Sequence, residues 1–560
     1  MISYRTKPED PPKTVKVLGR GGTVRGMNKN WFNVIDELSQ QKYGVDLGRV
    51  DEWHKLDQEE NVNIVLVPRS QHGEERCIKA KFSELDKLKK FETYVEVDDL
   101  GQDRISTTWV LSIKGQEIRA RLVARGFEEL EDVPRESPTI SRSSMRVLLA
   151  IAVQKKWKVK TTDIKSAFLQ GKKLKRTVHL IPPKESETLV GKIWRLVRPL
   201  YGLNDASRQF YESISEFLLH VGCCQSKLDT ALFMKYNKNN ILIGCIGLHV
   251  DDFLHLGTID FDNDVMEKLR DRFLAGKLEA ASFDYIGFHI MQNQNSIVLD
   301  QTEYLKNCEI PIISRERAKC KDDPLTPKEC TSLRSCVGSL NWAVQGTRPD
   351  KAFDMVELST KSRSGKVSDL LRASKVMKNL KDDGGYMIFP DLGDTHNWKI
   401  FVFTDASFAN LCDGVSSMGA FIVLLVGENS SCVALNWQGK KVKRVVKSTL
   451  EAEALSLQEG IEDAIYHRLL IEEVLKLSPR SLPVHGFVDN HDTVDAIYST
   501  KPVTSKLLRI NISSLKEKLQ NKDVCDVQWC EGSEQLADCM TKKGTCGLQW
   551  LSVLQNGILE

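Results

Sequence analysis

The sequence predicts a multidomain chain that combines α+β and α/β folds, and three observations support this fold class. At about 150 residues per domain, its 560 residues correspond to three or four domains. Helix-like and strand-like patterns alternate over residues 80–260. From residue 397 onward, three strands come first and are followed by helix, strand, helix, strand and helix. That order is typical of a mixed sheet covered by helices.

Breaks in these patterns predict four parts. Residues 1–75 are polar, basic at the start and interrupted by glycines, which is typical of a linker or the tail of a preceding domain. Residues 76–260 hold the first alternating region, and residues 261–395 mix amphipathic helices with short strands. Residues 396–560 hold the second sheet.

Composition constrains the cellular compartment of the protein but does not indicate its activity. The 79 basic and 76 acidic residues nearly cancel, so a nucleic-acid partner would have to bind local basic patches. The 14 cysteines include no Cys-x-x-Cys pair, which favours free thiols in a reducing compartment. No signal peptide and no apolar run of about 18 residues is present, so we expect a soluble, intracellular protein with no membrane partner.

A first group of carboxylates lies near an apolar segment. Residues 241–250 are almost continuously apolar, Asp251 and Asp252 follow, and the apolar character resumes at 253–254. This pattern predicts a buried hairpin with two acids at its tip. Adjacent side chains on a strand face opposite ways, so one acid should take most of the metal binding. We predict that this acid is Asp251, with Asp163 facing it from a neighbouring strand.

A solvated turn is the ordinary explanation of an Asp-Asp pair, and three other pairs in this chain fit it. The pair at 322–323 precedes a proline, and the pair at 382–383 precedes two glycines. The pair at 98–99 follows an apolar strand, but no apolar return strand comes after it. We therefore expect these three pairs to lie on the surface.

A second group comprises Asp405, Glu453, Asp489 and Asp538. Residues 399–404 and 484–488 are predicted strands that end at two of these acids, and Asp538 opens a helical segment. A single acid in such a position is usually a cap or a surface charge. Four in this order favour a metal site.

The predicted helix at 448–475 separates two glutamates. Ser448 and Glu451 fit a capping box, which gives Glu451 a structural role. Glu453 borders the buried stripe, where the helix meets the sheet, and is the ligand candidate. Two carboxylate groups in tandem, each suited to two divalent ions, predict one site that joins nucleotides and one that cuts a phosphodiester backbone.

The strings around these acids resemble the reverse transcriptase and RNase H of copia-type LTR retrotransposons. The matching polymerase strings are RARLVARGF at 119–127, DIKSAFLQG at 163–171, LYGLNDASR at 200–208, VDD at 250–252, YIGFHI at 285–290, GSLNW at 338–342 and TRPD at 347–350. The matching nuclease strings are TDAS at 404–407, STLEAE at 448–453, DN at 489–490 and QLADCMTK at 535–542. The resemblance covers residues 80–560 and is to the reverse transcriptase plus RNase H portion of the Pol polyprotein. Residues 1–75 only loosely resemble the junction between integrase and polymerase in such polyproteins, as a linker or the tail of the integrase region.

This resemblance implies a right-hand polymerase with palm, fingers and thumb, followed by an RNase H-like mixed sheet with helices. It implies an RNA-directed DNA polymerase with ribonuclease H activity and with Mg²⁺, or Mn²⁺, as two ions per site. All seven acids would be catalytic metal ligands: Asp163, Asp251, Asp252, Asp405, Glu453, Asp489 and Asp538. The implied partners are an RNA template, a DNA or RNA primer, an RNA–DNA hybrid and dNTPs. The implied location is the cytoplasm, in virus-like particles, with the nucleus as the alternative.

Five further residues are expected to contact the incoming nucleotide. Arg119 and Arg121 share one face of a predicted strand, which is either solvated or faces phosphate groups. By resemblance, Tyr201 and Gly202 lie beside the nucleotide. Phe168 would be ordinary core by residue type alone, but by resemblance it would block a ribose 2′-hydroxyl.

Three departures from the family pattern keep a second hypothesis open. His249 replaces a tyrosine, Ser207 replaces a proline, and Cys530 lies where many RNases H carry a histidine. None of them removes a metal ligand. The alternative is a degenerate retrotransposon remnant that binds nucleic acid without catalysis, or a chain active at only one site. The sequence does not predict the primer, the preferred metal or the oligomeric state.

Overall fold

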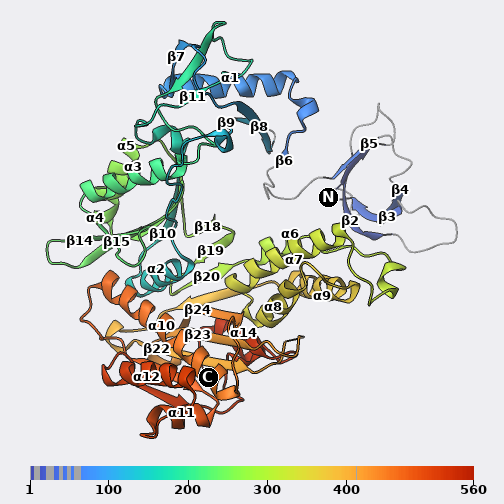
Figure 1. The fold of residues 1–560 in the computed structure, drawn as a ribbon. Helices are drawn as coiled ribbons and strands as arrows, with labels where there is room; N and C mark the ends of the chain where they lie inside the picture. The colour runs from blue at the N-terminus through green and yellow to red at the C-terminus, as the bar shows by residue number, and fades with distance from the viewer. Residues whose placement is uncertain are drawn as a thin grey trace. The chain divides into compact units, whose positions relative to one another are not determined.

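In a computed structural model, whose ribbon is drawn in Figure 1, the chain divides into two compact units. The structure describes residues 2–5, 13–20, 31–36, 42–46, 52–55, 65–115, 117–411 and 413–559. The first unit comprises Met1–Glu128, Thr177–Leu196 and Leu200–Leu203, and the second comprises Glu129–Arg176, Val197–Pro199 and Asn204–Glu560.

The first unit begins with a five-stranded antiparallel sheet in the order β4-β3-β2-β1-β5. Its strands are β1 (Ile2–Arg5), β2 (Lys13–Arg20), β3 (Trp31–Asp36), β4 (Lys42–Asp46) and β5 (Glu52–Lys55). Much of the predicted linker or tail at 1–75 lies outside the described residues, and that assignment stays a prediction.

The rest of the first unit combines one helix with two small sheets, β6-β8-β9 and β11-β12-β7. Their elements are β6 (Val65–Leu66), η1 (Arg69–Gln71), α1 (Glu75–Lys90), β7 (Tyr94–Asp98), β8 (Thr107–Lys114), β9 (Glu117–Ala124), η2 (Gly126–Glu128), β11 (His179–Leu180) and β12 (Lys192–Leu196). Helix α1 packs against β9 through a small apolar core that includes Cys77, Leu111 and Ala120. Asp98 ends β7 and pairs with Lys192 of β12 at 2.6 Å, which agrees with the surface role expected for that Asp-Asp pair.

The second unit begins with a six-stranded sheet in the order β13-β14-β15-β16-β10-β17. Its strands are β10 (Val159–Ile164), β13 (Cys224–Gln225), β14 (Leu232–Tyr236), β15 (Leu242–His249), β16 (Asp252–Gly257) and β17 (Ala275–Ala280). The helices beside it are α2 (Arg142–Lys155), η3 (Ala167–Gln170), α3 (Ala206–His220), α4 (Ile259–Phe261), the π-helix η4 (Asp262–Glu267) and α5 (Lys268–Arg272). The apolar run predicted as a buried hairpin strand is β15, which is buried along almost its whole length.

A second sheet and a group of helices follow. The sheet has the order β18-β19-β20-β21, with strands β18 (Ser282–Tyr285), β19 (Phe288–Gln292), β20 (Ser296–Asp300) and β21 (Tyr386–Pro390). The chain between the last two strands forms α6 (Thr302–Asn307), η5 (Arg317–Lys319), α7 (Pro327–Gly346), η6 (Pro349–Lys351), α8 (Ala352–Thr360) and α9 (Val367–Asp383). Thr326 and Glu329 form a capping box that begins α7.

Among the described residues, no helix is long and apolar enough to cross a membrane.

A buried ion pair stabilises the end of this helical group. Arg348 is 3% exposed and donates from Nε and Nη2 to the two carboxylate oxygens of Asp350, at 2.9 and 3.0 Å. Its Nη1 donates to the carbonyl of Gly384 at 2.7 Å. Burial alone would raise the pKa of Asp350, but Arg348 and Lys351 outweigh it and hold that pKa below its usual range.

We expect Arg348→Met to lower the free energy of unfolding by about 3 kcal/mol at pH 7, because it leaves a buried carboxylate without its main partner. A carboxyl whose pKa is lowered by folding contributes stability above its unfolded pKa, and this contribution is lost as the pH falls through the folded value. The difference between the two proteins should therefore shrink below about pH 4. Urea unfolding at both pH values measures it. Lys351→Met, which removes the more exposed partner, is the control and should cost less than about 1 kcal/mol.

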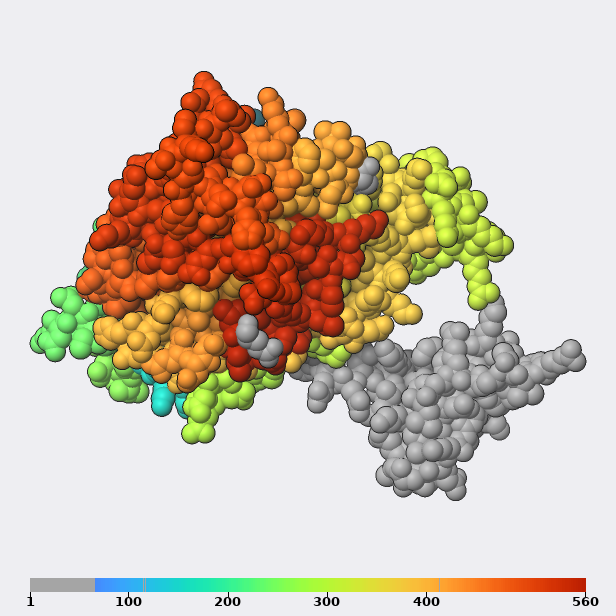
Figure 2. Space-filling view, turned by 90° about the horizontal axis from the view of Figure 1, so that it is seen from below, coloured from blue at the N-terminus to red at the C-terminus, as the bar shows by residue number. Residues whose placement is uncertain are grey.

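The C-terminal part of the second unit is a five-stranded mixed sheet with helices. Its residues, coloured orange to red, are seen together in Figure 2. Its order is β24-β23-β22-β25-β26, in which β25 and β26 run parallel to β22. Its elements are η7 (Thr395–Asn397), β22 (Lys399–Ser407), β23 (Met418–Val426), η8 (Glu428–Ser430), β24 (Cys432–Lys441), α10 (Thr449–Leu475), β25 (Val484–Val488), α11 (His491–Tyr498), α12 (Lys506–Gln520), β26 (Asp526–Trp529), α13 (Asp538–Thr541) and α14 (Leu548–Asn556). The predicted order is confirmed, except that two α-helices instead of one separate the last two strands and two instead of one follow the last strand. The boundaries predicted at residues 76, 261 and 396 stay predictions.

Candidate active sites

The hairpin formed by β15 and β16 positions the first carboxylate group. Asp252 is the first residue of β16, where it lies opposite His249 on one side and opposite Asp163 of β10 on the other. Val250 adopts a left-handed conformation with φ of 56°, and it forms the turn together with Asp251. The three predicted acids are therefore at the same end of neighbouring strands.

The strand register corrects one detail of the prediction. We expected Asp163 to face Asp251, but its partner across the ladder is Asp252. The reason is that Asp251 lies in the turn, where its carbonyl accepts a hydrogen bond from the backbone N–H of Ile164 at 2.8 Å. Which of the three carboxylates binds metal stays a prediction.

Electrostatics at this group favour a bound cation. Burial, together with the neighbouring charges of Asp251 and Asp163, raises the pKa of Asp252 to about 6. Burial lowers the pKa of His249, so the residue in the family's tyrosine position adds no compensating charge at neutral pH. Clustered carboxylates of this kind fit divalent ions, which prefer hard oxygen ligands.

Strand β17 approaches Asp163 through a glycine that the sequence reasoning missed. The pairing between β10 and β17 shifts here, because Thr162 lies opposite Leu278 whereas Ile164 lies opposite Ala275. A Cβ added to Gly276 would lie 1.9 Å from Oδ1 of Asp163. Glycine inside a strand often marks such a bulge or a close approach, and this was the available signal.

The residues expected near the nucleotide fall into both units. In the first unit, Arg119 and Arg121 are exposed on β9, and the guanidinium of Arg121 lies 5.5 Å from the centre of the Tyr201 ring. Gly202 has φ of 88°, and an added Cβ would lie 2.1 Å from the carbonyl oxygen of Ala124. The turn at 201–202 can therefore approach β9 closely only with glycine in this position.

Phe168 belongs to the second unit. It lies in η3, five residues after Asp163, and is partly buried against the apolar core. This packing agrees with its ordinary role as core. Its role beside a ribose stays a prediction.

The second carboxylate group is assembled by four elements of the C-terminal sheet. Asp405 lies in β22, Glu453 in the first turns of α10, Asp489 directly after β25, and Asp538 at the start of α13. Carboxylate oxygens of the three aspartates lie within 4.8 Å of one another. A hollow of about 490 Å³ is lined by Asp405, Asp489 and also Glu453. The structure thus brings together all four acids that the sequence singled out.

Burial makes this second group strongly suited to a cation. Asp405 is 1% exposed, and burial raises its pKa to about 6. Burial also raises the pKa of Glu453 well above its usual value, and the charges of Asp405 and Asp489 add to this effect. No hydrogen bond reaches Oδ1 of Asp405 or Oε2 of Glu453 within the part of the chain that the structure describes. Buried, unsatisfied carboxylate oxygens are costly, and a divalent ion would satisfy them.

Lys542 is a charged neighbour of this group to which the sequence analysis gave no role. Its Nζ contacts Oδ1 of Asp538 and lies 3.5 Å from Oδ1 of Asp405 and 4.0 Å from Oδ2 of Asp489. Burial lowers the pKa of Lys542, but the three acids outweigh burial and the pKa is raised. Spacing of four residues from Asp538 at a helix start was the signal that could have identified it.

Of the two glutamates of α10, Glu451 has the capping role that the sequence predicts, and the metal-binding role of Glu453 stays a prediction. Oγ of Ser448 accepts a hydrogen bond from the backbone N–H of Glu451 at 3.2 Å. The carboxylate of Glu451 accepts from the backbone N–H of Lys447 at 2.8 Å, instead of from Ser448 as a standard capping box would require. Glu451 therefore caps the helix start, and Glu453 is left to line the hollow.

Cys530 is buried beside this site and has a packing role. Its sulfur accepts a hydrogen bond of 3.7 Å from Nε2 of Gln535, which also donates to the carbonyl of Thr404 at 3.0 Å. These contacts tie the segment before α13 to β22. Burial raises the pKa of the Cys530 thiol to about 12, so the thiol is neutral at pH 7 and does not replace a histidine in proton transfer.

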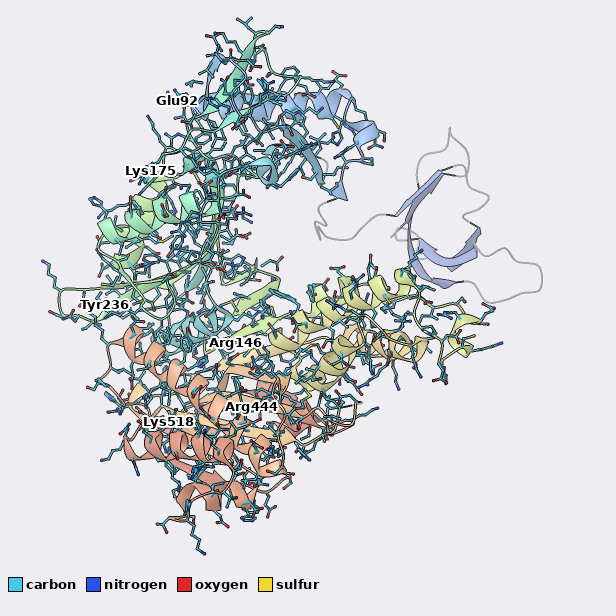
Figure 3. All side chains as sticks on the ribbon, in the orientation of Figure 1. Glu92, Arg146, Lys175, Tyr236, Arg444 and Lys518 are labelled. Atoms are coloured by element: carbon cyan, nitrogen blue, oxygen red, sulfur yellow. The ribbon has the colours of Figure 1, made fainter. Side chains whose placement is uncertain are left out.

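A basic patch covers the end of β24 and the segment after it, and is composed of Lys440, Lys441, Lys443, Arg444 and Lys447. Lys440 pairs with Glu459 at 3.0 Å, and Lys441 pairs with Asp413 at 3.3 Å. Lys443 and Lys447 are exposed, and Arg444 is labelled in Figure 3. The exposed members can contact phosphate groups.

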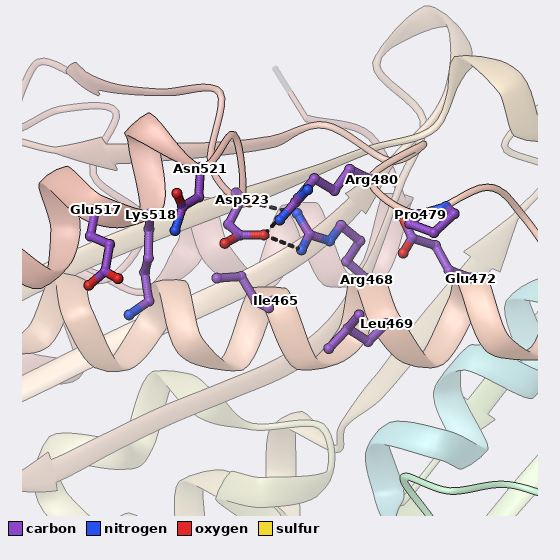
Figure 4. A pocket seen from close by; sticks show the side chains of 10 residues that line it. All are labelled: Ile465, Arg468, Leu469, Glu472, Pro479, Arg480, Glu517, Lys518, Asn521 and Asp523. Carbon is purple, nitrogen blue, oxygen red and sulfur yellow. Dashed lines mark hydrogen bonds and ion pairs between the residues drawn. The ribbon is translucent and has the colours of Figure 1, made fainter.

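A second hollow on this part of the chain has a structural explanation (Figure 4). It has a volume of about 530 Å³ and lies between α10 and the end of α12. Asp523 pairs there with Arg468 at 3.1 Å and with Arg480 at 2.9 Å. Because these charges satisfy one another, they brace α10 against the α12–β26 loop and leave little free charge for a ligand.

Comparisons with known proteins show which family this chain resembles. Residues 91–311 match the family model described as reverse transcriptase (RNA-dependent DNA polymerase). The chain is 28% identical over 450 residues to the retrovirus-related Pol polyprotein from transposon RE1 of Arabidopsis thaliana, covering 76% of this chain and 29% of that protein. It is 25% identical over 509 residues to that from transposon TNT 1-94 of Nicotiana tabacum, covering 83% and 36%.

A solved structure shares the fold. The foamy viral protease-reverse transcriptase dRH, in complex with double-stranded DNA, superposes with a TM-score of 0.50 at 14% sequence identity. The match covers 85% of this chain and 74% of that one. It supports the right-hand polymerase arrangement of the fold.

Proposed function

Because the chain is a copia-type retrotransposon Pol sequence with a reverse transcriptase domain, we propose that it has two activities. The first carboxylate group copies element RNA into DNA, and the second cleaves the RNA strand of the resulting hybrid. The observation that carries the proposal is that the seven predicted acids fall into two groups, one at β10 and the β15–β16 hairpin and one formed by β22, α10, α13 and the end of β25.

In the polymerase reaction, the primer 3′-hydroxyl attacks the α-phosphate of a dNTP and pyrophosphate leaves. Asp163, Asp251 and Asp252 would hold divalent ions, which would activate the hydroxyl and neutralise the phosphate charge. The protein's own contribution is to keep three carboxylates at one end of β10 and β16. Arg119 and Arg121 would bind phosphate groups, with Tyr201 and Gly202 beside the nucleotide and Phe168 beside its sugar.

In the nuclease reaction, water attacks a phosphodiester of the RNA strand and the 3′-oxygen leaves. Asp405, Glu453, Asp489 and Asp538 would hold the divalent ions, which would supply the activated water and stabilise the leaving oxygen. Mg²⁺ or Mn²⁺ suits these all-carboxylate groups. The exposed lysines of the basic patch would contact the hybrid backbone. The site of action would be the cytoplasm, in virus-like particles, with the nucleus as the alternative.

The two activities should be separable by single substitutions. We expect Asp251→Asn to reduce primer extension on an RNA template by more than about a hundredfold, since even residues that only support metal ligands are worth 10–100-fold. RNA cleavage in the same reaction should persist. Glu453→Gln should show the reverse pattern, because it removes a ligand from the second group only. Both reactions are measured with Mg²⁺ and with Mn²⁺.

The result that contradicts the proposal is equally direct. Folded wild-type protein that binds a hybrid but neither extends a primer nor cleaves RNA with either ion would favour a degenerate, non-catalytic remnant. Parallel loss of both activities in Asp251→Asn would argue against two independent sites.

A further inference from the structure

The ammonium group of Lys542 lies among the carboxylates that the proposed nuclease function assigns to metal binding. It contacts Asp538 and is 3.5 Å and 4.0 Å from oxygens of Asp405 and Asp489. These are the same three aspartates whose oxygens lie within 4.8 Å of one another. Lys542 thus supplies the positive charge that the cluster has in this structure.

A divalent ion and this ammonium group compete for the same space. Mg²⁺ lies about 2.1 Å from its oxygen ligands, and the nitrogen of an ammonium group lies about 2.8 Å from the oxygens that accept its hydrogen bonds. At these distances from the same carboxylate oxygens, the two cations would occupy the same space. Two cations at that separation also repel each other strongly. Binding a metal ion there therefore requires the lysine to leave.

The surroundings allow this exchange. The Lys542 side chain is 39% exposed, and it follows the short helix α13 at the mouth of the hollow. Asp405, by contrast, is fixed within β22, and Thr541 donates a hydrogen bond to its carboxylate from the buried side. The carboxylates are thus held by the fold, while the lysine is free to swing on a flexible four-carbon chain.

We propose that Lys542 is a resident counter-cation, which occupies the metal position of the nuclease group and is exchanged for the divalent ion. This inference rests on the proposed nuclease function. Before metal binding, Lys542 keeps the aspartates gathered without a bound ion. It also weakens metal affinity, because each binding event must break its ion pairs. The lysine is a positioning residue for the metal site.

Metal binding, measured without turnover, tests this inference. Free Mn²⁺ is followed by electron paramagnetic resonance during titration of the full chain, and the binding that disappears in Asp405→Asn is assigned to the nuclease group. Removing the charge in Lys542→Gln should tighten that binding by roughly tenfold, the effect of losing one competing charge pair. Lys542→Arg, which keeps the charge, should remain within about threefold of wild type. Lys543→Gln removes the same charge from the exposed neighbouring residue and should have no effect.

A second readout is the melting temperature. Without metal, Lys542→Gln should melt at a lower temperature than wild type. Mn²⁺ should raise the melting temperature of Lys542→Gln by more than it raises that of wild type. If wild type binds Mn²⁺ normally and Lys542→Gln binds it equally or more weakly, the proposed role of the lysine is overturned. The proposed nuclease site is not affected by that result. Absence of any Asp405-dependent binding in both proteins would overturn the proposed nuclease site, and this inference with it.

Discussion

Replacing Gly276 by alanine is expected to reduce primer extension by more than about a hundredfold, the loss that a misplacement of about 1 Å can cause at a reacting group. The new Cβ would lie 1.9 Å from Oδ1 and 2.4 Å from Cγ of Asp163. Such contacts are far below van der Waals separation, so either the carboxylate or strand β17 must move. Aspartate has the shortest acidic side chain, so a change of its side-chain torsions cannot relieve the contact and keep the carboxylate oxygens in place.

The loss should be confined to the polymerase reaction. Gly276 lies in β17, the edge strand of the six-stranded sheet, and the nuclease carboxylates lie at another sheet, so RNA cleavage should stay within about twofold of wild type. Single-turnover primer extension and hybrid cleavage are measured on the same preparation over a range of Mg²⁺ concentrations. If a displaced Asp163 is the cause, part of the lost rate should return at high Mg²⁺.

Gly338→Ala is the matched control for this substitution. Gly338 lies inside α7, and among the described residues no atom apart from those of its chain neighbours and the surrounding helix backbone lies within 4 Å of an added Cβ. Alanine is also favoured over glycine in a helix by about 1 kcal/mol, so this variant should be at least as stable as wild type. Primer extension by Gly276→Ala within about threefold of that by Gly338→Ala would show that the approach of β17 does not position Asp163.

The parts of the site that depend on local sequence were predictable. The hairpin followed from an apolar run and two acids, because a buried strand and its turn are encoded by neighbouring residues. The start of α10 followed in the same way, because Ser448 and Glu451 act within one helical turn. Asp489 could be placed because it comes directly after a buried strand, and Asp405 because it follows the apolar residues of β22, although that strand continues to Ser407.

The remaining features depend on register and on contacts between distant segments. Whether Asp163 faces Asp251 or Asp252 is decided by which residues form the turn, and a shift of one residue changes the answer. The approach of Gly276 to Asp163 joins strands more than a hundred positions apart. The pairing of Arg121 with Tyr201 likewise joins segments that no local pattern connects.

Replacing the buried Arg146 by methionine is expected to lower the free energy of unfolding by about 3 kcal/mol, because three carbonyl groups lose a charged donor. Arg146, which is labelled in Figure 3, belongs to α2 beside the six-stranded sheet. It is 1% exposed. It donates to the carbonyls of Gln345 and Gly346 at 2.7 and 3.1 Å, and to that of Leu435 at 3.2 Å. Burial lowers its pKa to about 9, so the guanidinium is still protonated at pH 7.

These three carbonyls explain why a cation is buried here. Gln345 and Gly346 end helix α7, where the helix dipole favours positive charge. Leu435 lies at an irregularity in the pairing of β23 and β24, between residues 434 and 436, which frees its carbonyl from the ladder. The ring of Trp437 lies 3.9 Å from the guanidinium and adds a cation–π contact. One side chain thereby joins α2 to both the helical group and the C-terminal sheet.

The loss should also uncouple these elements during unfolding. Urea unfolding of Arg146→Met, followed by tryptophan fluorescence and by hydrogen exchange of the C-terminal sheet, should show that sheet separating from the rest at lower urea. Arg142→Met is the matched control. Arg142 lies one turn earlier in α2 over Trp342, at 4.2 Å from the ring, and is only partly buried, so its loss should cost less than about 1 kcal/mol. Equal destabilisation by the two substitutions would show that the carbonyl cluster contributes little beyond the contact of an arginine with a ring.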